Sequence, residues 1–314
     1  MASVSIIDTD GTGDYTTISA WIAAKAGVLS GVTEGQCRGA DLLTETAQID
    51  ITGFSSNSAA NYVKLTVLTG SRHNGVPGAG FRVTVSSGNY VLINREAYTR
   101  VEYLELYGGL EGALYPDVGG ATNVQVSYCL AKGGNSGVYY SEAAGSVTFI
   151  NCIAYDGIQG FALIAAGAWT LYNCTTVDIT NVGYRLNDAS GTMVVMNCIG
   201  YNSTNYDFLE TAGMMTTSYC LSKDATADDN GATGAQINKT LTFNNAAAND
   251  FRLASTDTDA INNGVDTPKT IFTDDIDGTA RPVGAWDIGA DEYAAADSSV
   301  VPQAMSYYRR LRSV

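Results

Sequence analysis

The cysteines of this chain recur at an almost constant spacing, and that period limits the possible folds more than any other feature of the sequence. Five of the six are separated by 23, 22, 24 and 22 residues: Cys129, Cys152, Cys174, Cys198 and Cys220. Disulfide frameworks and zinc sites do not show a long, even spacing of this kind. A period of about 20–50 residues is instead typical of solenoids and other repeat architectures. We therefore expect a solenoid in which each cysteine marks the same position of one coil.

Each repeat contains three short segments with the character of β-strands. In the coil around Cys152 they are residues 147–150, 153–155 and 161–163. Apolar and polar residues alternate there with period two, which is the pattern of a strand, and turns rather than helices join the segments. The pattern predicts an all-β fold, a right-handed parallel β-helix with three short strands and about 22–24 residues per coil.

Neighbouring columns of the repeat give the expected register. Coils of a β-helix stack at about 4.8 Å, so each side chain lies over its counterpart in the next coil. The cysteines should form an inward-facing column of reduced thiols, because a reducing cytosol keeps thiols free. By the same count Leu106, 23 residues before Cys129, belongs to the preceding coil. Asparagines that precede three of the cysteines are expected to form an amide ladder at a left-handed turn: Asn151, Asn173 and Asn197.

The repeat divides the chain into four parts. Residues 41–248 carry the predicted coils. Residues 1–40 form an N-terminal segment with a capping helix at residues 15–25, because an open solenoid end exposes strand edges and core. Residues 249–297 lose the period and are predicted to form an irregular C-terminal cap. Residues 298–314 form a separate basic tail.

Charge and hydropathy exclude several kinds of partner. The 314 residues include 17 basic and 32 acidic side chains, which gives a formal net charge of −15. A protein this acidic does not neutralise phosphates, so nucleic acid is not an expected partner. No apolar run reaches the roughly 18 residues of a membrane-spanning helix, and membrane insertion is not expected. The first residues lack the basic and apolar regions of a signal peptide, which predicts synthesis in the cytoplasm without one.

Two motifs in the chain carry a resemblance to a known group of proteins. The sequences DDIDGTARP at residues 274–282 and DIGADEY at residues 287–293 resemble the closing segment of bacterial and phage parallel β-helix repeat proteins. The stretch GTGDY at residues 11–15, ahead of the predicted helix, resembles the start of β-helix proteins encoded by phages. The resemblance covers most of the chain and implies the fold. It leaves function open, because one fold hosts many activities.

The broad fold also hosts pectate lyases, polygalacturonases and tailspike glycosidases, so the acidic residues are the candidates for chemistry. If the protein is an enzyme, Asp156 and Asp178 are the best catalytic candidates, because their carboxylates would stack about 5 Å apart in adjacent coils. Asp is also common at turns, where its side chain binds the local backbone, and we favour that interpretation. Catalysis is therefore not expected.

No metal or other cofactor is expected. Asp274, Asp275 and Asp277 are weak candidates for calcium ligands, since this ion binds carboxylate oxygens. They lack the spacing of the calcium-binding loop, so a solvated acidic turn is the favoured interpretation. The single histidine, His73, lies in a polar segment without a nearby Cys or Asp, which disfavours a catalytic triad or a histidine metal site.

The tail differs in chemistry from the rest of the chain. Residues 298–314 contain no acidic residue, and arginine and tyrosine are enriched at protein–protein interfaces. We expect the tail to dock on a protein surface that carries acidic and apolar groups, although a frayed terminus is the alternative. The predicted docking residues are Tyr307, Tyr308, Arg309, Arg310, Leu311 and Arg312.

An acidic β-helix with a basic tail fits a non-enzymatic structural or surface protein of a bacteriophage virion. It would serve as a capsid decoration protein, a head or tail fibre or an adhesin, assembled in the host cytoplasm and placed on the virion surface. The expected partners are other virion proteins of the capsid or tail scaffold, other copies in a homo-oligomer, and host surface polysaccharide.

Two alternatives stay open at the level of the sequence. The first is a tailspike-like, polysaccharide-degrading lyase or glycoside hydrolase, which would show a cleft with two or more convergent carboxylates. The second is a bacterial surface β-helix that binds carbohydrate, which would show clustered exposed aromatic residues such as Tyr172.

Overall fold

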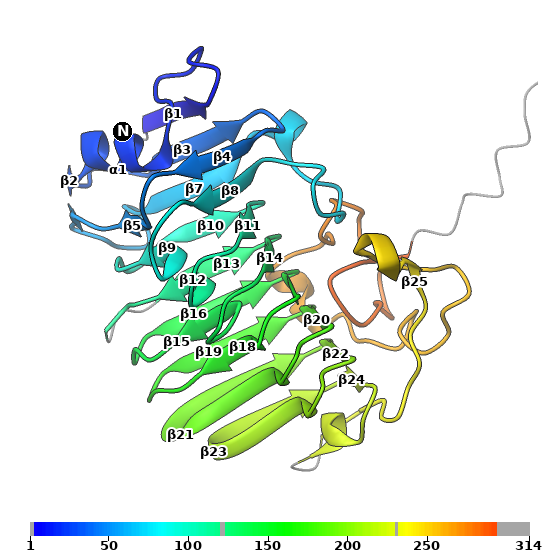
Figure 1. Cartoon of the computed structure of the whole chain (residues 1–314). Coiled ribbons are helices and arrows are strands. Elements are labelled where there is room, and N and C mark those ends of the chain that lie inside the picture. The colour runs from blue at the N-terminus through cyan, green and yellow to red at the C-terminus, as the bar shows by residue number, and fades with distance from the viewer. Residues whose placement is uncertain (1–2, 120–122, 230–231, 294–314) are drawn as a thin grey trace, which may run out of the picture.

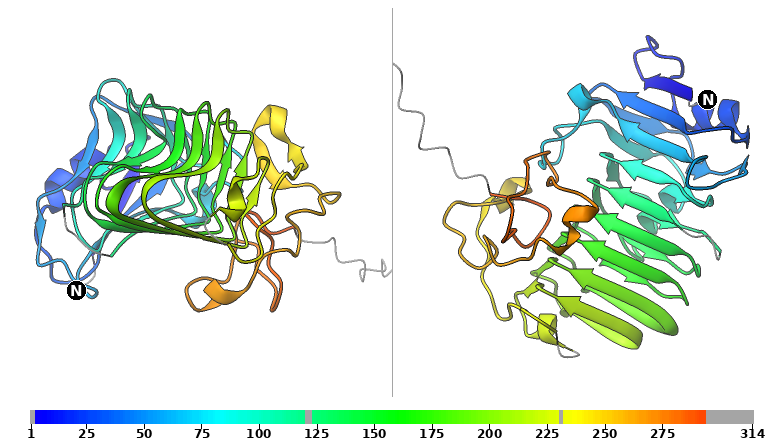
Figure 2. Two further views of the ribbon diagram at one scale, coloured as in Figure 1. Left: turned by 90° about the horizontal axis from the view of Figure 1, so that it is seen from below. Right: turned by 180° about the vertical axis from the view of Figure 1, so that it is seen from behind.

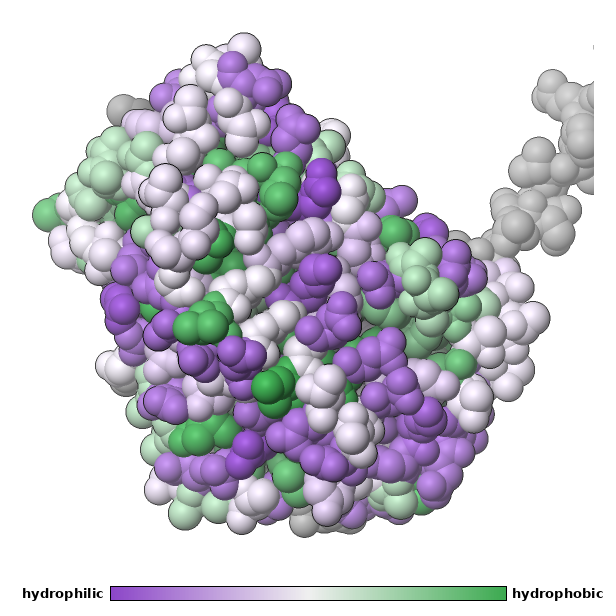
Figure 3. Space-filling model, viewed as in Figure 1, coloured by the Kyte–Doolittle hydropathy of each residue, from purple (hydrophilic) through white to green (hydrophobic). Residues whose placement is uncertain are grey.

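The computed structural model of the chain is a right-handed parallel β-helix of about eight turns, which confirms the predicted fold class (Figure 1). It describes residues 3–119, 123–229 and 232–293. Every strand of the solenoid pairs in parallel with its counterpart in the neighbouring coils. The face seen in Figure 3 is largely hydrophilic, with scattered hydrophobic residues, as expected for a chain with this net charge.

Three stacks of short strands form the walls of the solenoid. The first contains β1 (Ser3–Asp8), β3 (Thr33–Arg38), β7 (Val63–Val67), β10 (Arg100–Glu102), β13 (Val124–Ser127), β16 (Ser146–Ile150) and β19 (Ala168–Tyr172). The second contains β4 (Leu42–Glu45), β8 (Arg82–Val85), β11 (Glu105–Tyr107), β14 (Leu130–Lys132), β17 (Ile153–Tyr155), β20 (Thr175–Val177), β22 (Ile199–Tyr201) and β24 (Leu221–Ser222). The third contains β5 (Ile49–Ile51), β9 (Tyr90–Asn94), β12 (Gly112–Pro116), β15 (Tyr139–Ser141) and β18 (Gln159–Leu163).

The last two coils join the third wall directly to the first. β21 (Val182–Met196) pairs with β18 at its start and with β19 at its end, and β23 (Tyr206–Ser218) pairs along β21. β23 is the last strand of these two walls among the described residues.

The cysteine column is buried inside the solenoid. All six cysteines are free and have no exposed surface. The thiols of the five repeat cysteines each donate to the carbonyl oxygen two residues earlier, at 3.3–3.4 Å. Leu106 lies in β11 of the preceding coil, as expected, but Leu104 rather than Leu106 precedes Cys129 in the column, because Glu105 pairs with Leu130. The turn between β12 and β13 is two residues longer than its counterpart in the next coil, and this shifts the count.

A ladder of aromatic rings fills the centre of the last coils. The ring centroids of Tyr139, Phe161, Tyr184 and Phe208 follow one another at 4.7, 5.4 and 4.7 Å, with interplanar angles of 10°, 5° and 7°. These distances match the spacing of the coils, so like side chains stack from one coil to the next. The ladder ends at Phe208 in β23.

A short helix closes the N-terminal end. α1 (Ile18–Lys25) buries Ile18, Trp21 and Ile22, and Glu45 accepts hydrogen bonds from the backbone N–H of Ile18 and of Ser19. A carboxylate at a helix start stabilises the unpaired N–H groups and the positive end of the helix dipole. β2 (Gly27–Val28) follows this helix directly and lies beside it (Figure 1), and it pairs with β6 (Phe54–Ser55).

The C-terminal segment, residues 243–293, lies along the flank of the solenoid and does not cover its end (Figure 2). It includes the antiparallel pair β25 (Phe243–Asn245) and β26 (Asp250–Leu253) and the 3-10 helices Ala246–Ala248 and Thr267–Thr270. Its apolar residues pack on outward-facing side chains of the second wall, such as Ile153, Val177 and Ile199. Residues 240–243 belong to the range 41–248 predicted to form coils, but Phe243 pairs antiparallel with Leu253 instead.

Residues 223–229 and 232–236 partly cover the last coil. They contain the 3-10 helix Thr226–Asp228, and parallel bridges join Ser218 to Thr233 and Leu221 to Gln236. The end of the solenoid and its flank are therefore covered by two different parts of the chain.

Candidate functional sites on the flank and at the end of the solenoid

A buried arginine fastens the C-terminal segment to the solenoid. Arg281 donates to Glu292 Oε2 at 2.8 Å, and the two side chains are 0% and 5% exposed. It also donates to Asn151 Oδ1 at 3.0 Å and to the carbonyl oxygens of Gly289 and Ala290 at 3.0 and 3.1 Å. A buried charge is tolerated only when it is paired and hydrogen-bonded, and Arg281 meets that condition.

The asparagine column also binds the C-terminal segment. Asn151, Asn173 and Asn197 have φ values of 48°, 49° and 53°, in the left-handed region expected for this turn. The amide of Asn197 donates to Asn173 Oδ1 at 3.1 Å, which is one rung of the expected ladder. Asn151 instead donates to Asp274 O at 2.8 Å, and Asn173 donates to Asp287 O and Gly289 O at 3.1 Å. The column is therefore mainly a docking strip for the C-terminal segment.

The glycine of the DIGADEY motif is required by close approach to the solenoid. Gly289 has a φ of +102°, and a Cβ atom at this position would lie 2.4 Å from Ile199 Cδ1. Only glycine combines this backbone conformation with such a contact. The motif that resembles other β-helix proteins thus acts here in packing.

Three carboxylates meet in the same segment. Ligand atoms of Asp275, Asp277 and Asp291 lie within 4.8 Å of one another, and carboxylate oxygens suit calcium. Two of the three predicted weak candidates are thereby brought together. Asp274 is not part of this group. It accepts a hydrogen bond from the Tyr128 hydroxyl at 2.6 Å instead. Asp291 was missed, although its place in the DIGADEY motif was a signal.

The carboxylates of this group also bind the backbone. Asp275 accepts from the N–H groups of Asp277, Thr279 and Glu292, and Asp291 accepts from Leu253 N–H at 2.7 Å. Burial, with the neighbouring charge of Asp277, raises the pKa of Asp275 to about 9 and that of Asp291 to about 7. Their first role is therefore to hold the turns of the segment together.

A pocket of about 410 Å³ opens within the C-terminal segment. Glu292 lies in its wall, and burial together with the charge of Asp287 raises the pKa of this carboxyl to about 7. A second carboxylate, Asp257, has both oxygens occupied by backbone N–H groups. The lining residues are Ser255, Asp257, Ile261, Asn262, Thr279, Ala280, Pro282, Glu292 and Tyr293.

The predicted catalytic pair lies at exposed turns. Asp156 and Asp178 have φ values of 56° and 53°, and the side chain of Asn202 donates to Asp178. A short polar side chain favours the left-handed conformation by binding the local backbone or its neighbours. This placement favours the turn interpretation over a catalytic one.

Two other residues, His73 and Tyr172, lie in surroundings that differ from those expected. His73 is buried, its Nε2 donates to Tyr128 O at 2.7 Å, and Nδ1 accepts from Gly75 N–H at 3.3 Å. Burial lowers the pKa of this imidazole, so it is neutral and structural. Tyr172 packs against Phe272 of the C-terminal segment, with ring centroids 6.4 Å apart, and does not belong to an open aromatic surface.

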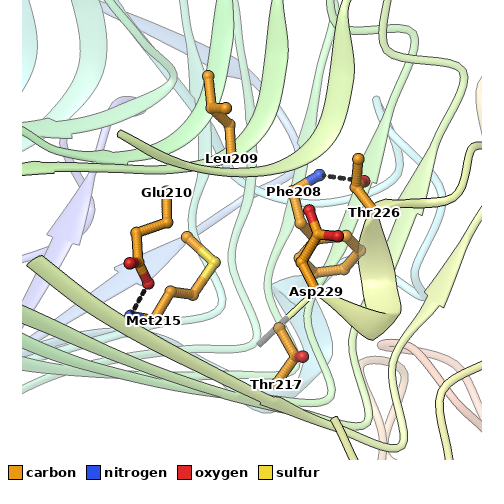
Figure 4. Close-up of a pocket in the computed structure, with 7 residues that line it drawn as sticks. All are labelled: Phe208, Leu209, Glu210, Met215, Thr217, Thr226 and Asp229. Carbon is orange, nitrogen blue, oxygen red and sulfur yellow. Dashed lines mark hydrogen bonds between the residues drawn. The ribbon is translucent and has the colours of Figure 1, made fainter. Parts of the chain in front are cut away.

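A second pocket, here called the end pocket, lies at the C-terminal end of the solenoid and has a volume of about 190 Å³ (Figure 4). Glu210 accepts a hydrogen bond from Met215 N–H, and Thr226 Oγ1 accepts one from Phe208 N–H at 2.9 Å. Burial and the charge of Asp228 raise the pKa of Asp229. The pocket is lined by Phe208, Leu209, Glu210, Met215, Thr217, Thr226 and Asp229.

The predicted docking cluster at residues 307–312 lies outside the described residues. Within the part of the chain that the structure describes, no helix is long and apolar enough to cross a membrane.

Comparison with known proteins adds two similar solved structures. The chain matches no family model and no curated protein. The pectin methylesterase from Aspergillus niger is 11% identical, with a TM-score of 0.45 over 78% of this chain and 92% of that chain. The pectate lyase Pel9A is 13% identical, with a TM-score of 0.46 over 93% of this chain and 96% of that chain.

Proposed function

We propose that the protein is a non-enzymatic rod on the surface of a bacteriophage virion, anchored to other virion proteins through residues 298–314. The observation that carries the proposal is the fastening of the C-terminal segment by Arg281. Tyr293, the last described residue, donates its N–H to Asp287 Oδ2 at 2.6 Å and thus ends on a fixed part of the flank. The described chain thus ends at a fixed point of the flank, which suits a following anchor.

The chemistry of the tail supports a docking role. The whole chain has a formal net charge of −15, whereas residues 298–314 combine three arginines and two tyrosines with no acidic residue. Arginine pairs bidentately with carboxylates, and tyrosine buries a large area at small entropic cost. A capsid decoration protein, a fibre or an adhesin would each use such an anchor, and host surface polysaccharide is a further proposed partner.

The test is incorporation into particles. Virions made with the full chain should contain the protein, and virions made with a chain that stops after Tyr293 should lack it. A circular dichroism melt of the shortened protein controls for folding, because the Arg281 contacts all precede the truncation. Normal occupancy of the shortened protein, or absence of the full chain from purified particles, would overturn the proposal.

A polysaccharide-directed enzyme is the second candidate, favoured by the pocket that contains Glu292. A carboxyl with a pKa of about 7 is suited to general acid catalysis. Glycoside hydrolysis also needs a second carboxyl, and the oxygens of Asp257 in the same pocket are bound to the backbone.

Incubation with pectins, alginates and capsular polysaccharides separates the candidates. Under the first proposal no reducing ends and no unsaturated products appear. Turnover that is lost in Ser255→Trp, which fills the exposed rim of the pocket, would favour the enzyme. Asp156→Ala and Asp178→Ala are the controls outside the pocket. Binding without turnover would instead favour a carbohydrate-binding surface protein.

A further inference from the structure

The residue pair Asn74–Gly75 lies in the loop between the 3-10 helix Thr69–Ser71 and β8. Asn74 is exposed, and its side chain has no hydrogen-bond partner in the described part of the chain. Gly75 is buried, and a Cβ atom at its position would lie 3.2 Å from Ile276 Cγ2 in the C-terminal segment. A free side-chain amide is therefore followed by a backbone that is held in place.

The ring of a buried histidine faces the backbone amide of Gly75. His73 is 3% exposed, and its Nε2 lies 2.7 Å from Tyr128 O, which can only accept a hydrogen bond. The proton of the neutral ring is therefore on Nε2, and Nδ1 carries a lone pair. That lone pair accepts the N–H of Gly75 at 3.3 Å. A basic nitrogen is thus bound to the N–H group that directly follows Asn74.

This arrangement suits an intramolecular reaction of the asparagine. The backbone nitrogen that follows an asparagine can attack the carbonyl carbon of its side chain, because the chain already holds both groups close together and a five-membered imide forms. Glycine hinders this attack least, since it has no Cβ atom. A neutral imidazole that accepts the N–H proton acts as a general base and activates the nitrogen.

We propose that Asn74 is a site of spontaneous deamidation and that His73 is the base of the reaction. As the bond between Gly75 N and Asn74 Cγ forms, the proton of this nitrogen passes to His73 Nδ1. The Cγ–Nδ2 bond then breaks, and the former side-chain NH₂ group takes that proton and leaves as ammonia, so the imidazole returns to its neutral form. Water finally opens the imide at either carbonyl group, which gives aspartate or isoaspartate at position 74.

A buried carboxylate supports the proton transfer to His73. Glu105 has no exposed surface, and its oxygens accept the N–H groups of Gly78 and Gly80 at 2.6 Å. Burial lowers the pKa of His73, and the charge of Glu105 opposes that shift. The imidazolium that forms during the reaction is therefore partly compensated by a fixed negative charge.

A second copy of the same tripeptide lacks these features. The sequence Asn-Gly-Val occurs at residues 74–76 and again at residues 263–265. The side chain of Asn263 donates to two backbone carbonyl oxygens, both at 3.0 Å, and Gly264 N–H donates to Trp286 O at 2.8 Å. Here the side-chain amide is held, and the N–H faces a carbonyl oxygen instead of a base. The structure therefore predicts a fast site and a slow site with the same local sequence.

The product would alter the contact between this loop and the C-terminal segment. A Cβ atom at Gly75 would lie 3.5 Å from Arg252 Cδ, so the new carboxylate arises one residue from this contact. Isoaspartate would also lengthen the backbone of the loop by one methylene group. The reaction depends on this loop alone, and it goes beyond the proposed function.

The experiment is peptide mass spectrometry of the full chain after incubation at neutral pH. In the folded protein Asn74 should convert roughly tenfold faster than Asn263, or more. Isoaspartate should be among the products, because direct hydrolysis of the side-chain amide gives aspartate alone. In denaturant the two sites should convert at similar rates. His73→Asn can still accept the Gly75 N–H through Oδ1 but supplies no base, so it should lower the rate at Asn74 by roughly tenfold or more.

A circular dichroism melt shows whether the His73→Asn variant is folded. Equal rates at the two sites in the folded protein would overturn the inference, as would aspartate without isoaspartate at position 74. An unchanged rate at Asn74 in the folded variant would overturn the role of His73. If the variant does not fold, the wild type decides: a rate at Asn74 at least as high in the folded protein as in denaturant supports the base, and a lower rate contradicts it.

Discussion

Arg281 and Glu292 form a buried ion pair with an N–O distance of 2.8 Å in the C-terminal segment. The same guanidinium donates to Asn151 on the solenoid, 130 residues away in sequence. One side chain thus joins the two parts of the fold. Removing one partner of a buried pair costs more than the pair contributes, because it leaves an uncompensated charge.

Replacing Arg281 by methionine should release the C-terminal segment while the coils stay folded. The expected loss is about 3–5 kcal/mol, because Glu292 would remain buried without its partner. Hydrogen exchange of residues 250–293 measures it. Arg95→Met is the control, since Arg95 pairs with Asp117 at the surface. Unchanged protection of the segment in Arg281→Met would show that apolar packing alone holds it.

Replacing Asn173 by leucine should also loosen the segment. Asn173 donates to Asp287 O and Gly289 O, and the variant removes both hydrogen bonds at a cost of about 1–3 kcal/mol. Asn202→Leu is the matched control, because Asn202 has a similar φ of 65° at an exposed turn. Chemical denaturation of both variants separates the lost hydrogen bonds from the backbone strain. Equal destabilisation would contradict the docking role of the asparagine column.

The sequence predicts the coils well because stacking repeats one side-chain environment at each turn. The cysteine column, the left-handed asparagines and the third strand at residues 161–163 all follow from that period. Counting back 23 residues from Cys129 gives Leu106 instead of Leu104 for the cysteine column. The turn between β12 and β13 is two residues longer than the turn between β15 and β16, and this changes the spacing without changing the pattern of the strands.

The C-terminal segment could not be placed from sequence, because its contacts have no period. Arg281 reaches Asn151 across 130 residues, and nothing in either local sequence marks the other. Asp274 and Asp291 show the same limit. Asp274 stands beside Asp275 in sequence but binds Tyr128, whereas Asp291 comes from a later turn to meet Asp275 and Asp277.

The stability of the segment should fall as pH rises. The folded-state pKa is raised to about 9 for Asp275 and to about 7 for Asp291 and for Glu292. The folded form therefore holds protons that the unfolded form has lost, and this stabilisation is complete below about pH 4. It declines as pH rises and is gone for Asp291 and Glu292 above about pH 7 and for Asp275 above about pH 9.

Hydrogen exchange of residues 250–293 at several pH values, corrected for the intrinsic exchange rate, measures this dependence. Asp277→Asn should flatten it, because the charge of Asp277 raises the pKa of both Asp275 and Asp291. A segment that is more stable at pH 8 than at pH 5 would contradict the assignment.

Protection of the amide groups at the edge of β23, the last strand, should depend on Thr226. Its Oγ1 accepts the N–H of Phe208 at 2.9 Å, and valine at this position removes the acceptor at similar volume. The expected cost is about 1 kcal/mol, with faster amide exchange at Phe208. Thr204→Val, at an exposed turn, is the control. Unchanged exchange at Phe208 in Thr226→Val would show that another group protects this edge.

The thiols should be inaccessible in the folded protein. All six cysteines are free and fully buried, and burial raises the pKa of the Cys37 thiol far above its usual value. A thiol reacts as its thiolate, so both access and ionisation require the coils to open. A disulfide reagent should label none of the six in the native state and all six in denaturant. Ser255→Cys, which adds an exposed thiol, should contribute one rapidly labelled group and so controls for the reagent. Labelling of Cys152 or Cys198 at the rate of that exposed thiol would mean that the cysteine column opens without unfolding, and the solenoid would then lack the continuous core that the stacked coils imply.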